Sequence, residues 1–366
     1  ELEALLAAVQ ASGPSLLNHD PLPSKTLEGL AAALTATPFV RPLHILPHQA
    51  YQPHPSLAAT FSPDGSRVVI GDGSMASIWE RRTGRLVGLL QGHSQQVTSA
   101  AFSPDGKYIV TSSRDGTARI WDATSGRSIT ILGGHSGMAR RASFSPDGRR
   151  ILTVSDDGTA RLWDDTGRHL AVLSGHVGVV AFGTFSPDGA SVLTASLDHT
   201  LRLWDGRTGH LLAVLEGHMA DVYHASFSPD GRRVVSASGD HSARVWDTRT
   251  GRSITVLKGH SAPISSANFS PDGARIVTAC SDFTARIWEV STKKLLAVLR
   301  GHGGDVTYAS FSPNGSLVIT ASGDRTARLW DAFSGQQVAV LWGHTAWVRT
   351  AQFSPDGVHV VTTSDD

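Results

Sequence analysis

Short apolar runs separated by turn residues follow one another along most of the chain. Between residues 95 and 135 there are four such runs, over residues 97–103, 107–113, 117–122 and 127–132. The first two are joined by Pro104-Asp105-Gly106, where Pro presets φ for the first turn position and Gly can adopt a left-handed conformation. The pattern predicts four strands connected by tight turns, which is an antiparallel meander.

The same unit returns every 41 or 42 residues. Its FSPDG or FSPNG turn begins at Phe61, Phe102, Phe144, Phe185, Phe227, Phe269, Phe311 and Phe353. A Gly-His pair and a Trp followed by an acidic residue keep the same period, and such a period is typical of repeat architectures. The strands are apolar on both faces, so each sheet is expected to pack between two neighbouring sheets. Sheets stacked in this way and arranged in a ring form a propeller.

The GH, FSPDG, S/T-x-x-x-D-G-T and WD motifs at this spacing resemble those of the WD40-repeat family, over about residues 40–366. The resemblance implies an all-β propeller of four-stranded antiparallel blades, with strands a to d from the centre outward and usually seven blades. Members of the family are mostly non-catalytic platforms for protein partners. We therefore expect a scaffold or sensor module that binds a protein or peptide, and not an enzyme.

The resemblance also implies a buried hydrogen-bonded network in each blade, made of a His, an Asp, a Trp and a Ser or Thr. The histidines are His93, His135, His176, His218, His260, His302 and His344. The carboxylates and indoles are Asp115, Asp157, Asp198, Asp240, Asp282, Asp324, Trp121, Trp163, Trp204, Trp246, Trp288 and Trp330. Buried Trp and His N–H groups need acceptors, and an ionised Asp is a strong one.

Two hydroxyl positions compete for a place in this network. Thr111, Thr153, Thr194, Ser236, Thr278 and Thr320 lie four residues before each Asp, and a second small polar residue usually lies two before it. Both face the same side of the strand, so the sequence leaves the choice open. In the first repeat, Gly73 replaces the Asp and Ile70 the hydroxyl, so we expect its network to be missing.

Ser, His and Asp in one unit also suggest a hydrolase, since these are the parts of a catalytic triad. A catalytic centre is built once, with an oxyanion hole and a pocket, whereas this set recurs in almost every repeat. We therefore expect a structural role for it. An enzyme with a single site at the propeller channel and a purely structural spacer remain alternative interpretations.

Binding residues are expected at positions where WD40 proteins commonly contact partners: three and five residues after the GH histidine, and directly before the b–c Asp. These positions vary between repeats while the frame does not, as in a recognition surface placed on a fixed scaffold. The resulting candidates are Arg114, Met138, Arg140, Asp156, Asp221, Tyr223, Asp305, Trp347 and Arg349.

Composition narrows the partners further. The 32 basic and 32 acidic residues give no net charge, so we expect neither nucleic acid nor a membrane as partner. Cys280 is the only cysteine, which favours a reducing compartment such as the cytoplasm and offers no thiolate cluster for a metal. Seven of the 17 His belong to the GH pairs, and the others do not have the spacing of metal ligands. The Gly-rich turns contain no phosphate-binding motif. We expect no metal and no cofactor.

The two ends depart from the repeat. Residues 1–39 show helical spacing in 1–12 and again in 25–36, and are expected to form a helical segment or the remnant of a preceding domain. Their junction with the repeats resembles that in bacterial signalling NTPases of the STAND class. We expect the propeller to span 40–331, with 42–47 as outer strand of the seventh blade, and 332–366 to begin an eighth repeat. Alternatively, the seventh repeat keeps its own outer strand and an eighth blade is left incomplete.

Overall fold

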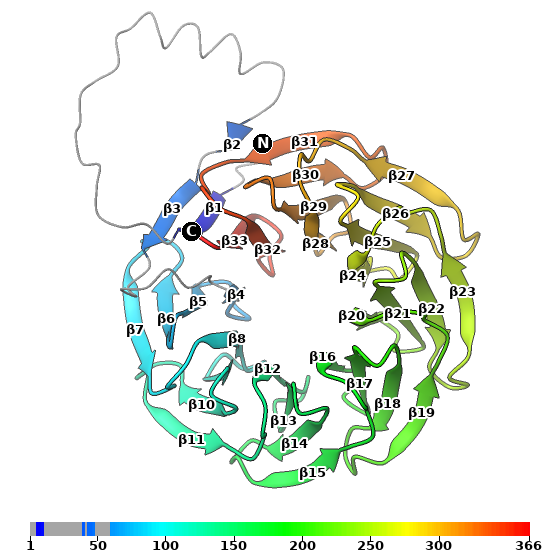
Figure 1. The fold of residues 1–366 in the computed structure, drawn as a ribbon. Helices are drawn as coiled ribbons and strands as arrows, with labels where there is room; N and C mark the ends of the chain where they lie inside the picture. Colours follow the sequence, from blue (N-terminus) through cyan, green and yellow to red (C-terminus); the bar gives the residue numbers. More distant parts are fainter. Residues whose placement is uncertain (1–4, 11–38, 41, 48–58) are drawn as a thin grey trace, which may run out of the picture.

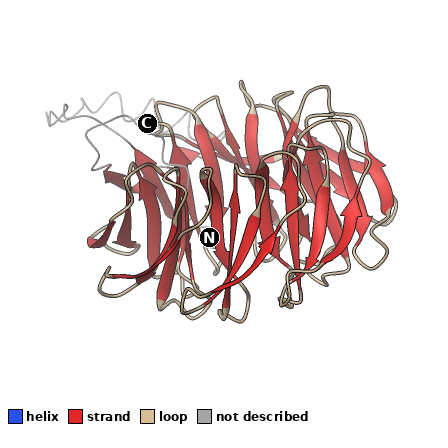
Figure 2. Ribbon diagram, turned by 60° about the horizontal axis from the view of Figure 1, so that its bottom comes forward, coloured by secondary structure: helices blue, strands red, loops and turns tan. Residues whose placement is uncertain are grey.

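The computed structural model describes residues 5–10, 39–40, 42–47 and 59–366 of the chain. Eight β-sheets stand side by side around a central opening (Figure 1). In side view the strands run across the thickness of the ring, and loops lie on its two faces (Figure 2). Strands and turns account for this part of the chain, in which no helix occurs.

Seven sheets, here blades 1 to 7, are complete four-stranded antiparallel meanders in chain order. Blades 1 and 2 contain β4 (Ala59–Phe61), β5 (Arg67–Asp72), β6 (Met75–Glu80), β7 (Leu86–Gln91), β8 (Val97–Phe102), β9 (Tyr108–Ser113), β10 (Ala118–Asp122) and β11 (Ser128–Leu132). Blades 3 and 4 contain β12 (Ala139–Phe144), β13 (Arg150–Ser155), β14 (Ala160–Asp164), β15 (His169–Leu173), β16 (Val180–Phe185), β17 (Ser191–Ser196), β18 (Leu201–Asp205) and β19 (Leu211–Leu215).

The remaining complete blades follow the same pattern. Blades 5 and 6 contain β20 (Val222–Phe227), β21 (Arg233–Ser238), β22 (Ala243–Asp247), β23 (Ser253–Leu257), β24 (Ile264–Phe269), β25 (Arg275–Cys280), β26 (Ala285–Glu289) and β27 (Leu295–Leu299). Blade 7 contains β28 (Val306–Phe311), β29 (Leu317–Ser322), β30 (Ala327–Asp331) and β31 (Gln337–Leu341), and the short β2 (Phe39–Val40) pairs in parallel with β31. The prediction of seven four-stranded antiparallel blades is confirmed for these sheets.

The turn between strands a and b forms as the sequence predicts. In blade 2, Gly106 takes φ of +70°, and the Ser103 hydroxyl donates a hydrogen bond of 2.7 Å to the Asp105 carboxylate. A residue with a side chain at Gly106 would be strained at this φ. Strands b and c then pair in register, with Trp121 opposite Ile109.

The hydrophobic core lies between blades rather than within any one of them. Val235 and Val245 of blade 5 pack with Ile264 and Ile276 of blade 6, and equivalent clusters join the other neighbouring blades. Strands b and c are almost entirely buried, whereas the outer strand d, such as Ser128–Leu132, is largely exposed. The apolar character of both faces of the inner strands is therefore explained by burial on both sides.

An eighth sheet, blade 8, joins the two ends of the chain. Its strand order is β3 (Pro42–Pro47), β1 (Leu5–Gln10), β33 (His359–Ser364) and β32 (Val348–Phe353). β32 and β33 are antiparallel, whereas β1 pairs in parallel with both β33 and β3. Val361 of this sheet packs with Val68 and Trp79 of blade 1, and β32 contacts β28 and β29 of blade 7.

Two expectations about the ends need correction. Residues 42–47 do not supply the outer strand of the seventh blade, because β31 pairs antiparallel with β30 and fills that place. Pairing a strand that follows through a tight turn costs less conformational entropy than pairing a strand from the distant N-terminal region, because the loop to be closed is shorter. The prediction of the first helix is also wrong for Leu5–Gln10, which form β1 and pair with β33. Helix propensity is weak, and a sheet edge that needs a partner easily overrides it. The second predicted helix, in 25–36, lies outside the described residues.

Candidate functional site

Each of blades 2 to 7 contains the same four-residue network. In blade 2, His93 Nδ1 lies 2.9 Å from Asp115 Oδ2 and His93 Nε2 lies 2.8 Å from Thr111 Oγ1, while the Trp121 indole N–H donates to that same Oγ1 at 2.8 Å. The GH loop thus supplies the His, strand b the hydroxyl, the b–c turn the Asp and strand c the Trp. Equivalent contacts join His135, His176, His218, His260 and His302 to their own blades.

The open choice between two hydroxyls is resolved by these contacts. The network uses the residue four before the Asp, whose side chain is fully buried in blades 2 to 7. The residue two before the Asp has a different role: the Ser113 hydroxyl accepts a hydrogen bond of 3.1 Å from the Asp115 backbone N–H. It therefore stabilises the b–c turn.

The pKa shifts in the network determine which of its atoms donate hydrogen bonds and which accept them. Burial lowers the pKa of His93 more than the nearby Asp115 raises it. The imidazole is therefore neutral. Burial alone would raise the pKa of Asp115, but hydrogen bonds from Thr117, His93 and Ser94 outweigh it and lower the pKa to about 2. The ionised Asp115 only accepts, so His93 Nδ1 donates to it and His93 Nε2 accepts from the Thr111 hydroxyl.

This order of Thr, His and Asp has the connectivity of a catalytic triad but lacks access to a substrate. The Thr111 side chain is fully buried, and its oxygen accepts the Trp121 N–H. A nucleophile needs an accessible oxygen and a place for the reacting carbonyl beside it. The geometry therefore favours a structural role for this network, because each polar atom finds a partner inside the blade.

We expect Thr153→Val to lower the free energy of unfolding by about 1–3 kcal/mol, because it leaves the Trp163 N–H and His135 Nε2 without partners. Valine has nearly the shape of threonine, so the change isolates the hydroxyl. Urea unfolding followed by circular dichroism measures the difference. The matched control is Thr153→Ser, since Ser236 fills this position in blade 5. Equal stability of the Val and Ser variants would contradict the proposed bonding.

The first and last repeats differ from the others. In blade 1 the Trp79 N–H donates to Ser77 at 2.8 Å, which agrees with the expectation that this repeat departs from the network. In blade 8, His344 contacts Asp366 at 2.9 Å and Thr362 at 2.8 Å, so most of the network is present. Asp366 was missed in the sequence, although it follows its GH histidine by 22 residues, as Asp115 follows His93.

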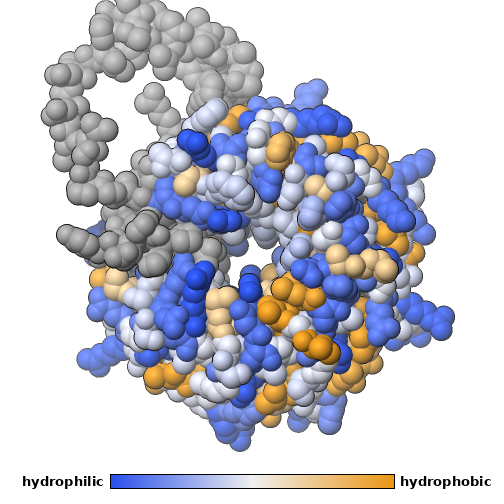
Figure 3. Space-filling view, in the orientation of Figure 1, coloured by the Kyte–Doolittle hydropathy of each residue, from blue (hydrophilic) through white to orange (hydrophobic). Residues whose placement is uncertain are grey.

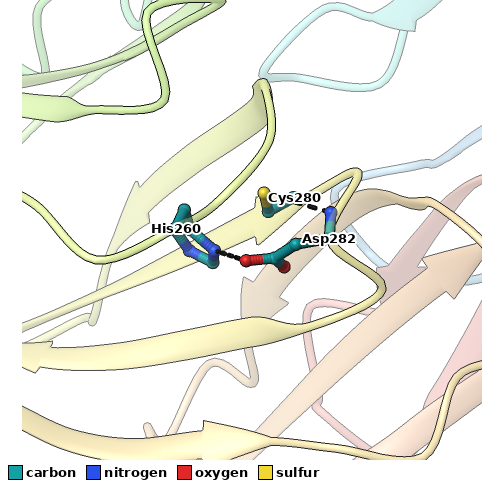
Figure 4. Close-up of side chains that lie close together, drawn as sticks. All are labelled: His260, Cys280 and Asp282. Atoms are coloured by element: carbon teal, nitrogen blue, oxygen red, sulfur yellow. Dashed lines mark hydrogen bonds and ion pairs between the residues drawn. The ribbon is translucent and has the colours of Figure 1, made fainter.

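Cys280 lies within 4.8 Å of His260 and Asp282, a grouping that could hold a metal ion (Figure 4). His260 already contacts Asp282 at 2.8 Å, and the Cys280 thiol donates to the Ala262 carbonyl while its sulfur accepts from the Asp282 N–H. Ser238 makes the same two contacts in blade 5. Burial raises the pKa of Cys280 to about 12, so its thiol stays protonated. Cys280 thus replaces the turn-stabilising serine.

The predicted binding residues lie on the loop face, which we define as the face bearing the d–a and b–c loops. All nine are exposed or half-buried. Arg140 is ion-paired with Asp156, and Arg349 Nε with Asp365 at 2.7 Å. The Arg349 guanidinium also lies 5.2 Å from the ring centre of Trp347. Arg140 and Arg349 are therefore held in fixed positions by residues of their own blades.

Glycines make room for the two large aromatic candidates. A Cβ at Gly239 would lie 3.0 Å from the Tyr223 hydroxyl, and a Cβ at Gly323 would lie 3.2 Å from the Trp347 ring. Both glycines stand directly before a b–c Asp, so each aromatic ring lies across a b–c loop. Trp347 thereby spans the boundary between blades 8 and 7.

Two apolar residues of the loop face were missed. Val177 and Met219 follow GH histidines and are 93% and 81% exposed. Their backbone N–H groups donate to Asp198 and Asp240, which directs their side chains away from the blade. Other repeats have Ser, Gly or Thr at this position, so the contrast was visible in the sequence. Figure 3 shows apolar surface gathered on one side of the central opening, amid a largely polar surface.

Comparison with known families gives seven matches to the model described as WD domain, G-beta repeat. They cover residues 84–122, 126–164, 167–205, 209–247, 251–289, 293–331 and 335–366. The matches begin after β4–β6, the strands of the repeat that departs from the network. A search of curated proteins found no match. No helix long and apolar enough to cross a membrane occurs in the described part of the chain.

Proposed function

The chain belongs to the WD40-repeat family, whose repeats generally mediate protein–protein interaction, and from this premise we propose that it is a non-catalytic scaffold or sensor that binds a protein or peptide on its loop face. The observation that carries the proposal is the contrast between a repeated buried frame and varied, exposed side chains above it. Aromatic and Arg side chains dominate the energy of many interfaces. Here Trp347, Tyr223 and Arg140 are such side chains.

Preorganisation supports the same proposal. Arg349 is fixed by Asp365 and stacked on Trp347, so little side-chain entropy remains to be lost when a partner binds. Val177 and Met219 add exposed apolar area to the same face. A partner that combines an acidic group with an apolar segment would match this surface.

The alternatives predict different observations. A hydrolase with a single site at the channel would show saturable turnover that one substitution removes. A structural spacer would bind nothing through the loop face. The fully buried hydroxyl of each network disfavours catalysis by the repeated Thr, His and Asp, and the projecting apolar side chains of the loop face disfavour a structural spacer.

The wider context of the chain is part of the proposal. The resemblance of its N-terminal junction to STAND-class NTPases, which now depends on the helix predicted in 25–36 because Leu5–Gln10 form β1, suggests the sensor end of a larger bacterial signalling protein in the cytoplasm. A phosphate-binding loop encoded upstream in the gene would support this context. A gene without any such region would leave the free-standing scaffold.

We expect Tyr223→Ala, Trp347→Ala and Arg140→Ala each to weaken partner binding by about 2 kcal/mol, or roughly 30-fold, with Tm nearly unchanged. Each removes exposed contact area without opening the core. The measurement is calorimetric titration of a partner obtained by pull-down with the unaltered protein. Lys107→Ala, in the a–b turn of the opposite face, is the control and should change neither quantity. If all three variants bind the partner as tightly as the unaltered protein does, recognition lies elsewhere, for example in residues 1–39.

A further inference from the structure

The innermost strands surround the central opening (Figure 1) and carry no acidic residue in the described part of the chain. None of β4, β8, β12, β16, β20, β24, β28 and β32 contains Asp or Glu, although acids and bases are equal in number overall. Their arginines are Arg140, Arg141 and Arg349. Arg140 and Arg349 are ion-paired, whereas Arg141 has no carboxylate partner among the described residues. Arg141 is thus an uncompensated cation of the channel wall.

Aromatic rings lie beside Arg141 along the channel wall. The Arg141 guanidinium lies 4.5 Å from the ring centre of Phe182, which lies 4.3 Å from that of His224. His224 in turn lies 6.2 Å from Tyr308, across the small Ser266 of the blade between them. All are third residues of strand a. The result is a row of flat side chains that begins at a cation.

His224 does not add to the charge of this row. Burial, together with the nearby Arg141, lowers its pKa to about 3, so the imidazole is neutral. It is 92% buried, and its Nδ1 has no hydrogen-bond partner. Arg141 is an exposed residue, although desolvation by the surrounding channel wall lowers the pKa of its guanidinium.

A hollow of about 150 Å³ lies beside Arg141. Its wall includes Phe182 together with hydroxyl and amide side chains, which are Thr60, Thr98, Ser99, Thr350 and Gln352. Hydroxyl and amide groups can donate hydrogen bonds to an anion. The Thr98 hydroxyl already donates to the Ala139 carbonyl, and Ser99 is hydrogen-bonded to Ser112, so the Gln352 amide is the neutral donor that remains for a ligand. The hollow therefore combines the unpaired Arg141, the ion-paired Arg140, this amide and one aromatic face, and no acidic side chain of the described residues lines it.

We propose that this channel hollow binds a small organic carboxylate, with Arg141 as its anchor. One guanidinium pairs with one carboxylate through two parallel hydrogen bonds, and neither group needs a further counter-charge. The ring of Phe182 would pack against the carbon skeleton of the ligand. A phosphate dianion would leave one negative charge unmatched, since the neighbouring Arg140 is already paired with Asp156. The hollow shares Arg140 with the proposed partner surface, but its anchor Arg141 is not one of the predicted binding residues, so the proposal does not depend on that surface.

The test titrates the whole protein by calorimetry with two matched pairs of probes. Benzoate and its amide represent a free aromatic acid, and N-acetylphenylalanine and its amide represent the carboxyl end of a peptide. We expect saturable binding of at least one acid, at least tenfold tighter than its amide. The preferred acid distinguishes a free small molecule from a peptide terminus.

Variants connect the binding to Arg141. Arg141→Met should weaken binding of the preferred acid at least tenfold, and Arg141→Lys should restore part of it because the charge returns without the planar fork. Arg168→Met, at an exposed outer arginine, is the control and should bind as the unaltered protein does. Circular dichroism and Tm verify that each variant is folded. The proposal is overturned if neither acid binds, if the amides bind equally, if Arg141→Met retains affinity, or if inorganic phosphate binds more tightly.

Discussion

Trp204→Ala is expected to lower the free energy of unfolding by about 3–5 kcal/mol, the range for truncation of a buried large aromatic residue. Trp204 is 2% exposed and packs with Leu152 and Leu162 of blade 3 and with Val180 and Val192 of blade 4. Its N–H donates to Thr194 at 2.9 Å. The substitution therefore opens a cavity between two blades and leaves a buried hydroxyl with one contact fewer.

Urea unfolding followed by circular dichroism measures this loss, because the substitution itself alters tryptophan fluorescence. Trp204→Phe keeps most of the ring and should cost less than Trp204→Ala. Leu212→Ala, on the exposed outer strand of blade 4, is the control and should change stability by about 0.5 kcal/mol or less. A loss below about 1 kcal/mol for Trp204→Ala would show that this indole is not an essential part of the core.

Acidification from about pH 7 to about pH 5 is expected to lower Tm strongly, because six buried histidines share one environment. In the unfolded chain they take up protons near pH 6.5. In the fold, burial lowers the pKa of His93, His135, His176, His218, His260 and His302. Below about pH 6.5 the unfolded state therefore binds more protons than the folded state, so the free energy of unfolding decreases as the pH is lowered.

Each histidine that stays neutral in the fold contributes a loss of up to about 1.4 kcal/mol per pH unit. The Asp partners act at lower pH: the pKa of Asp115 is lowered to about 2, so its contribution persists above about pH 4 and disappears as pH falls through about 2. Urea titrations at several pH values measure the slope, and a constant m-value would show that the same transition is being followed. A Tm that stays level down to about pH 5 would mean that the fold tolerates charged imidazoles.

The repeat made most of the fold predictable. Every marker residue recurs at one spacing, so the strands and turns could be assigned without any long-range information, whereas the His, Asp and Trp of the network were assigned through the resemblance to WD40 repeats. Two hydroxyls on one face of strand b could not be separated, because the distinction depends on which of them reaches the Trp121 N–H. The repeat period is a local property, whereas that contact depends on three-dimensional geometry.

The two ends of the chain were less predictable for a related reason. The run Pro42–Pro47 suits an outer strand of any blade, and its partner is decided by which strand edge is free. Similarly, nothing in the motif around Arg140 shows that Asp156, sixteen residues later, neutralises it. Alignment of third strand-a residues would have placed Arg141, Phe182, His224 and Tyr308 around one channel, but their contacts depend on blade order and side-chain reach.

Blade 8 sets the order in which the molecule can be completed during synthesis. β1 and β3 leave the ribosome before the seven complete blades, and β33, the strand that pairs with β1, emerges only after them. Strand pairs so far apart in sequence form slowly, and domains begin to fold while synthesis continues. The N-terminal strands must therefore wait with exposed edges until the last repeat arrives, and they are vulnerable to pairing with other chains during this interval.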